Sequence, residues 1–289
     1  MVGEAAALGS AASWAVSAVL IKGISTRRSA FYIMAARTAV AGLLALIVFA
    51  VVRPASPLDL PASTIVVLLV SAAVAISGDV AFVRAMAVED VSRVFTVSTS
   101  LYILVSVAGS VVFYGDALSP WLLLGGLAVL VGSRLVIHQP AGAATTARSG
   151  RKPMFALWLS VVAALFWSAS LLAVSRAMES VEPLTATAMR MPFMAVALVL
   201  FAASRGEHRQ ALAPRDASML ALSGALIGAS MLLFLAAAKL SDAGTVAVLT
   251  STSPIFVAPL AHFFLSERLT PRIATGTMTC MLGIWLASI

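Results

Sequence analysis

The sequence has few residues of the kinds that form disulfides or bind metal ions. Its 289 residues include one cysteine, Cys280, and three histidines. A single cysteine excludes an internal disulfide and a cysteine-rich metal site. No cluster of His, Asp, Glu or Cys has the spacing of metal ligands. We therefore expect no metal site and no other cofactor.

Charged residues are also scarce, at 11% of the chain, whereas 61% of the residues are hydrophobic. A soluble domain of this length carries about 25% charged residues. The polar surface is too small to cover a globule in water, so the chain is predicted to lie in a bilayer and to contact lipid. The net charge of +7 does not indicate nucleic acid, because the basic residues fall mostly between the apolar runs.

The apolar runs predict an all-α integral membrane protein with ten membrane-spanning helices. Each run approaches the ~20 residues that a spanning helix needs, is too long for a membrane strand, and lacks alternation with period two. The first run lacks the basic start of a signal peptide and is interpreted as a retained helix. The predicted spans are 5–23, 30–52, 63–86, 92–114, 119–138, 154–175, 183–204, 216–239, 243–265 and 271–289.

The chain contains an internal repeat. "SWAVSAVLIKG" at 13–23 aligns with "FWSASLLAVSR" at 166–176, and "FYGDALSPWLLLGG" at 113–126 aligns with "FLSERLTPRIATG" at 264–276. These alignments predict a first five-helix repeat at 1–138, a linker at 139–153 and a second repeat at 154–289. The matched pairs are Trp14 with Trp167, Ser17 with Ser170, Arg37 with Arg190, Asp116 with Glu267, Pro120 with Pro271, Gly125 with Gly276, and Gly132 with Gly283.

Five spans in each repeat place the second repeat in the membrane upside down relative to the first. Such inverted repeats are characteristic of alternating-access transporters, whose substrate site lies between the repeats near the midplane. The distribution of Lys and Arg gives an orientation. Thirteen lie at the connections that follow spans 1, 3, 5, 7 and 9, against three on the opposite face, namely Arg53, Arg176 and Lys239. The positive-inside rule therefore predicts that both termini lie outside the cytoplasm.

Taken together, the repeated tryptophan and arginine and the runs "DALSP" and "SERLTP" resemble the EamA-type members of the drug/metabolite transporter superfamily. The resemblance implies a secondary transporter, often an exporter of amino acids or other small metabolites. It also implies a central cavity lined by helices 1, 3, 4, 6, 8 and 9, and termini in the cytoplasm, against the charge count. The first repeat departs from the family pattern, with "YGDALSP" where a Gly-Glu-Arg-like run is usual.

Three charged residues stand well inside predicted spans, away from the span ends. Arg37 and Arg190 each serve either as a structural anchor or as a site for an anionic group. Asp79 is expected to pair with Arg37 or Arg84, because an unpaired carboxylate in hydrocarbon is costly. Asp79 could instead couple transport to protons. Arg190 has no acidic residue at its own depth and is the better candidate for a substrate carboxylate.

Milder candidates complete the predicted substrate path. Trp14 and Trp167 are expected on either side of the central site, with packing as the alternative role. The run "TSTSP" at 250–254 brings four hydroxyl groups in front of a proline in the ninth span, as a gate, a substrate contact or a packing device. The remaining predicted path residues are Ser17, Ser170, Tyr102, Thr250, Ser251, Thr252 and Ser253.

These features predict a secondary transporter of a small organic metabolite in the cytoplasmic membrane, amino-acid-like and exported. A sugar, nucleotide-sugar or sugar-phosphate transporter of the same architecture is the first alternative. A polytopic membrane transferase is the second; it would have a His or Asp cluster near an interface and sizeable loops, and the sequence shows neither, so an enzyme is not expected. The sequence leaves open whether the protein is a monomer or a homodimer.

Overall fold

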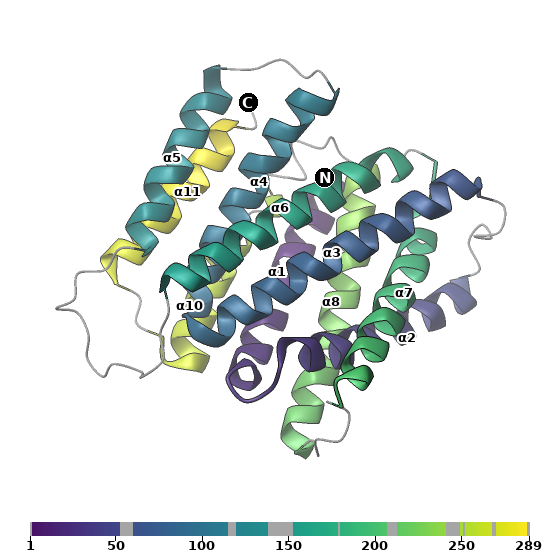
Figure 1. Cartoon of the computed structure of the whole chain (residues 1–289). Coiled ribbons are helices and arrows are strands. Elements are labelled where there is room, and N and C mark those ends of the chain that lie inside the picture. The colour runs from purple at the N-terminus through teal and green to yellow at the C-terminus, as the bar shows by residue number, and fades with distance from the viewer. Residues whose placement is uncertain are drawn as a thin grey trace.

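The computed structural model describes residues 2–52, 60–114, 120–137, 153–178, 180–206, 213–240, 249–250, 252–267 and 270–287. Within these ranges the chain is helical and has no strand, which confirms the all-α prediction. The described residues form ten helices, which are labelled in Figure 1. They are α1 (Val2–Ser25), α2 (Ala30–Val52), α3 (Ala62–Val88), α4 (Val91–Tyr114), α5 (Pro120–Ile137), α6 (Pro153–Met178), α7 (Pro183–Ser204), α8 (Pro214–Leu240), α10 (Ser253–Leu265) and α11 (Pro271–Ala287).

Seven of the described helices, α1 to α4 and α6 to α8, are long and apolar enough to cross a membrane. Large apolar side chains remain exposed along them, for example Leu43, Ile47 and Val51 on α2. An apolar surface of this extent is stable against lipid rather than water. The chain is therefore a multi-pass membrane protein. The other described helices, α5, α10 and α11, have 18, 13 and 17 residues.

The predicted ninth span, 243–265, differs from the described structure. The helix α10 begins only at Ser253, and Pro254 occupies its first turn, where no backbone N–H is needed. The proline therefore stands in the first turn of α10, and Leu249 and Thr250 shortly before it are also helical. Residues 241–248 and Ser251 lie outside the described residues, as does all but one residue of the predicted linker 139–153, since α6 starts at Pro153.

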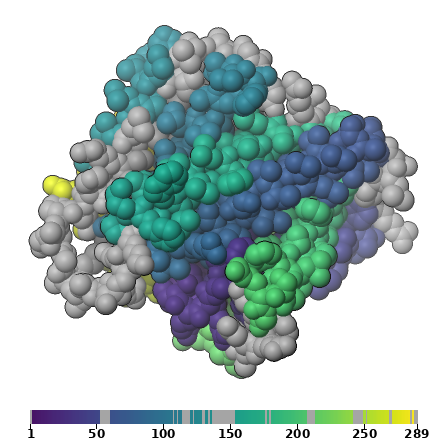
Figure 2. Space-filling model, viewed as in Figure 1, coloured from purple at the N-terminus to yellow at the C-terminus, as the bar shows by residue number. Residues whose placement is uncertain are grey.

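Helices from the first part of the chain pack in pairs with helices from the second part. The closest pairs are α1 with α8, α2 with α7, α3 with α6, and α5 with α11. Figure 1 shows α5 and α11 side by side at one end of the molecule, and Figure 2 shows α3 lying against α6 and α7. The most extensive helix contacts therefore lie between the two parts of the chain, and the main buried apolar cluster is formed mostly by residues of α1 to α4.

Two glycines allow the closest helix contacts. A methyl group at Gly224 of α8 would lie 2.4 Å from the carbonyl oxygen of Arg37 on α2. At Gly132 of α5 it would lie 2.6 Å from the carbonyl oxygen of Gly276 on α11. Small residues let backbones approach in this way when lipid supplies no hydrophobic force between helices. The pairs α2–α8 and α5–α11 depend on such contacts.

Candidate functional site

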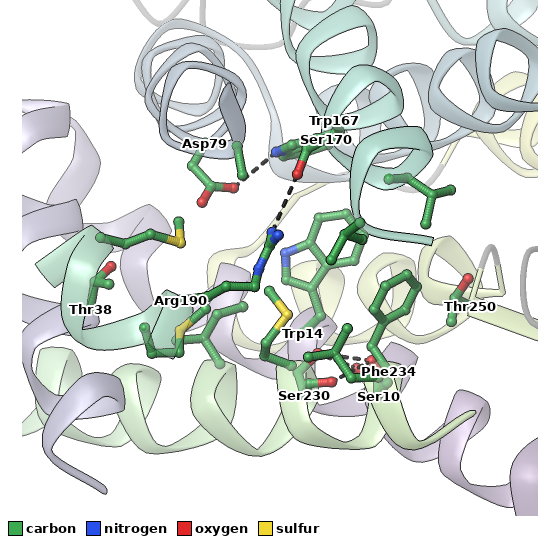
Figure 3. Close-up of a pocket in the computed structure, with 18 of the residues that line it drawn as sticks. Ser10, Trp14, Thr38, Asp79, Trp167, Ser170, Arg190, Ser230, Phe234 and Thr250 are labelled. Atoms are coloured by element: carbon green, nitrogen blue, oxygen red, sulfur yellow. Dashed lines mark hydrogen bonds between the residues drawn. The ribbon is translucent and has the colours of Figure 1, made fainter. Parts of the chain in front are cut away.

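A cavity of about 160 Å³ lies between the two parts of the chain. Its wall is formed by α1, α2, α3, α4, α6, α7 and α8, together with Thr250. Figure 3 shows Arg190 reaching from α7 toward Ser170 and Asp79, with Ser10, Ser230 and Phe234 on the other side of the cavity. The structure brings together eight of the residues singled out from the sequence: Trp14, Arg37, Asp79, Tyr102, Trp167, Ser170, Arg190 and Thr250.

The other candidates lie away from this cavity. Ser17 is fully buried, and its hydroxyl pairs with that of Ser223 at 2.7 Å. The hydroxyls of Thr252 and Ser253 donate to backbone carbonyl oxygens three residues earlier, both at 2.6 Å. Ser251 lies outside the described residues. In this conformation the hydroxyls of Ser17, Thr252 and Ser253 bond to groups of the chain itself.

Arg190 is held by two serines on the facing helix pair. Its Nη1 donates to the hydroxyl of Ser71 on α3, and its Nη2 donates to that of Ser170 on α6 at 3.3 Å. Ser170 in turn donates to the Ser71 carbonyl oxygen at 2.7 Å. Sequence reasoning missed Ser71, because one serine in an apolar span gives no signal of its own. Its offset of 152 residues from Ser223, close to that of the repeat, could have identified it.

Arg37 occupies the corresponding place in the first half without such partners. Its side chain is 1% exposed and lines the cavity, and its Nε and Nη1 atoms have no hydrogen-bond partner among the described residues. Hydrogen-bond donors buried in this way are rare and costly. The guanidinium of Arg37 is therefore a group that a polar ligand could satisfy.

Asp79 does not form the close ion pair that we expected. Its Oδ1 accepts a hydrogen bond from Trp167 Nε1 at 3.0 Å, and no described basic residue lies within ion-pair distance. Its charge still acts on both Arg37 and Arg190. The expected partner Arg84 is exposed and lies over the ring of Phe31 at 5.0 Å. Arg84 follows Asp79 by five residues, and two side chains at this spacing on an α-helix point about 140° apart. Arg84 therefore faces away from Asp79.

The two tryptophans meet, and do not flank the site as predicted. The rings of Trp14 and Trp167 are edge to face, with centroids 5.3 Å apart. Phe82 contacts both rings, and Phe95 packs against Trp14 at 4.5 Å. Both phenylalanines are buried. The two tryptophans therefore belong to one aromatic cluster together with Phe82 and Phe95.

Beyond these aromatic rings, polar contacts close one end of the molecule. Lys22 at the end of α1 donates to the carbonyl oxygens of Met86 and Glu89 at the end of α3. The carboxylate of Glu267 accepts the backbone N–H groups of Val91 and Ser92, at 2.8 and 3.2 Å, at the start of α4. A carboxylate is a favourable cap for a helix N-terminus. We call this end of the molecule the Glu267 face.

The surroundings of the Glu267 carboxyl group disfavour its charged form. Its side chain is buried, and burial raises its pKa above the ordinary value of 4.5, with a further increase from the neighbouring charge of Asp90. Hydrogen bonds from Ser92 and Val91 oppose this increase without cancelling it. The helix cap is therefore sensitive to protonation.

Apolar side chains that sequence reasoning did not single out form most of the cavity wall. They include Met34, Met191, Met194, Ile227, Met231 and Phe234. Apolar residues fill every span, so no pattern marked these ones. Among the described lining residues only Arg37, Asp79 and Arg190 carry a full charge. An apolar cavity with a few converging polar groups is the usual form of a small-molecule site.

Comparisons with known proteins agree with this architecture. A protein of known crystal structure superposes on the chain with a TM-score of 0.67 and 16% sequence identity, covering 97% of this chain and 94% of the other. A likeness at this identity shows a shared fold. No curated protein matches the chain. The sequence model of the EamA-like transporter family matches residues 1–138 and 154–289, so the chain belongs to that family of membrane transporters.

Proposed function

We propose that the protein is a secondary transporter that moves a small organic metabolite through the central cavity by alternating access. The observation that supports this proposal is the cavity, which lies between the two parts of the chain and is lined by buried charged side chains. The cytoplasmic membrane is its proposed location. The likeness between the first and second runs of helices is proposed to be an inverted repeat.

The helix contacts support this inverted repeat. In the proposed repeat the counterparts of α1, α2, α3, α4 and α5 are α6, α7, α8, α10 and α11. When each helix is replaced by its counterpart, the pair α1–α8 becomes α6–α3, and the pair α4–α6 becomes α10–α1. All four pairs are in contact. The pairs α2–α7 and α5–α11 are each exchanged into themselves. A packing that survives the exchange is what a two-fold axis between the halves requires.

The dimensions of the cavity bear on the kind of substrate. A cavity of about 160 Å³ is close to the engineered cavity of ~150 Å³ that binds benzene. It suits a metabolite of amino-acid size and is too small, in this conformation, for a nucleotide sugar. A small carboxylated metabolite, which includes amino acids, is therefore preferred over the larger sugar derivatives.

The chemistry of the lining favours transport over group transfer. The described lining residues include no His or Cys, and no Ser that contacts a basic residue other than Arg190. A transferase would need a general base or a nucleophile beside its substrate, and the carboxylate of Asp79 is already engaged by Trp167. Arg190, Arg37 and Asp79 are suited to bind and orient a charged solute.

The test is transport by purified protein in proteoliposomes, with substrates first found by thermal-shift screening of a metabolite library. Arg190→Gln should reduce uptake at least tenfold, because a buried charged hydrogen bond contributes about 1.5–3 kcal/mol. Arg84→Gln is the matched control, since that guanidinium is exposed and outside the cavity. Equal effects of the two variants, or no uptake of any solute by the wild type, would contradict the proposal.

Coupling to protons is tested separately at Asp79. If Asp79 carries the coupled proton, Asp79→Asn should abolish uptake driven by a proton gradient while exchange of substrate across the membrane continues. If Asp79 serves only to hold Trp167, the variant should retain the response to the gradient. The hydrogen bond from Trp167 at 3.0 Å makes both roles chemically reasonable.

A further inference from the structure

The charges of the cavity do not balance. Two guanidinium groups, those of Arg37 and Arg190, face one carboxylate, that of Asp79, among the described lining residues. With Asp79 ionised, the empty cavity carries one uncompensated positive charge. A buried charge without a counterion is costly in an apolar surrounding, so a ligand that brings one negative charge gains the most.

The donor groups identify where this negative charge would bind. Arg190 already donates through Nη1 and Nη2 to Ser71 and Ser170, and its Nε has no described partner. Arg37 has no partner for Nε and Nη1 among the described residues, although its side chain is 1% exposed. A guanidinium with unused donors matches the geometry of a carboxylate.

An ammonium group would fit the same cavity poorly. Its natural acceptor is Asp79, whose Oδ1 already accepts from Trp167, so an ammonium group would depend on Oδ2 alone. The two arginines that act on Asp79 would also repel a third positive charge. A zwitterion would leave the excess positive charge of the cavity unchanged.

We propose that the transported metabolite is a small organic monoanion, a carboxylate with an apolar body, whose carboxylate binds Arg37. This inference rests on the proposed function and names the substrate class of that site. The apolar body would lie against Met34, Met191 and Met194. Trp14 and Trp167 would close the cavity behind it, since both line it and contact each other.

Three compounds of one shape test the inference: 4-methylpentanoate, its neutral amide 4-methylpentanamide, and leucine, which adds the ammonium group. Binding to the purified protein at pH 7 is measured by calorimetry and thermal shift. The carboxylate is expected to bind at least about tenfold more tightly than either of the others, the difference that one charged hydrogen bond supplies. Tighter binding of leucine or of the amide would overturn the inference and leave the proposed transport function intact.

Variants identify the residue responsible. Arg37→Gln is expected to weaken binding of 4-methylpentanoate at least tenfold and to leave binding of the neutral amide unchanged, so the preference for the anion disappears. Arg37→Lys keeps the charge and should keep the preference, which makes the test independent of whether the Gln variant folds. Arg84→Gln is the control and should bind as the wild type does. An unchanged preference in Arg37→Gln would overturn the inference.

Asp79→Asn provides an opposite test, because it adds a second uncompensated positive charge. This variant should bind the dianion glutarate at least tenfold more tightly than the wild type does. Weaker binding of glutarate than in the wild type would count against the charge balance. If proteoliposomes transport other solutes but bind none of the three compounds, the monoanion is wrong; if they transport nothing, the proposed function itself fails.

Discussion

Ser17 and Ser223 hydrogen-bond to each other across α1 and α8 at 2.7 Å, whereas their counterparts Ser170 and Ser71 hold Arg190. The offsets are 153 and 152 residues, those of the internal repeat. The two serine pairs correspond in the repeat but have different hydrogen-bond partners. One pair bonds to itself, and the other bonds to an arginine. In an alternating-access cycle the halves exchange states, so Arg37 is expected to bind Ser17 and Ser223 when the cavity opens at the Glu267 face.

This exchange predicts the effect of Ser71→Ala. The variant removes an acceptor of Arg190 and should shift the protein toward the state open at the Glu267 face, by about tenfold. The reporter is Thr250→Cys in a Cys280→Ala background. Its thiol should then react more slowly with maleimide added on the side away from the Glu267 face, because fewer molecules are open on that side. Ser168→Ala is the control, because Ser168 bonds to Ser106 and the Tyr102 carbonyl oxygen and not to an arginine. Equal labelling rates in the two variants would contradict the exchange.

The position of Trp167 depends on Gly78. A methyl group at Gly78 would lie 2.6 Å from Trp167 Cδ1 and 3.1 Å from the Ala163 carbonyl oxygen. We expect Gly78→Ala to displace the indole ring, to break its bond to Asp79 and to reduce transport at least tenfold. Gly23→Ala is the matched control, since nothing lies within 4 Å of its added methyl group. It should leave transport unchanged and raise Tm slightly through the better helix propensity of Ala.

The pair α5–α11 should affect stability and not substrate binding. Gly132→Ala would press against backbone atoms of α11, including the Gly276 carbonyl oxygen, and should destabilise the protein by about 1–3 kcal/mol. Gly126→Ala on the same helix meets only the flexible end of Leu104, at 3.0 Å, and should cost less. Thermal unfolding in detergent measures both. Because neither α5 nor α11 lines the cavity among the described residues, ligand affinity should remain constant. A changed affinity in Gly132→Ala would be contrary to this expectation.

Glu267 predicts a dependence of stability on pH. Burial raises its pKa above 4.5, so the unfolded chain loses this proton at a lower pH than the folded protein does. The contribution of Glu267 to stability is therefore complete below about pH 4.5 and decreases as the pH rises through the folded pKa. Glu267→Gln should remove this part of the decrease in Tm, measured from pH 4 to 8. The groups around it are Asp90, Glu89, Arg93 and His262, and they remain the same in both proteins. An identical pH profile would show that Glu267 does not titrate there.

Orientation follows from the charge count. The excess of Lys and Arg at the connections after spans 1, 3, 5, 7 and 9 predicts that residue 289 lies outside the cytoplasm. A reporter enzyme that is active only outside the cytoplasm, fused after residue 289, should therefore be active. Activity of a cytoplasmic reporter at the same position would reverse the assignment and place the Glu267 face outside.

Composition and repetition predicted the architecture because they are properties of whole segments. The apolar runs identified the membrane, and most of the described helices begin and end within a few residues of the predicted spans. The matched positions of the repeat also selected Trp14, Trp167, Arg37 and Arg190, all of which line the cavity. The ninth span differed, because hydropathy alone could not distinguish a helix that contains Pro254 from one that starts there.

The partners of these residues were decided only by the tertiary structure. Sequence alone could place Asp79, Arg37 and Arg84 at similar depth, but it could not show that Asp79 bonds to Trp167 or that Arg84 turns outward. It also could not show that Ser17 lies outside the cavity while Ser170 lines it. The physical reason is that spans which are apolar on every side have no hydrophobic stripe to mark the face that turns inward. The sequence determined depth in the membrane, and helix packing determined rotation and thereby contact.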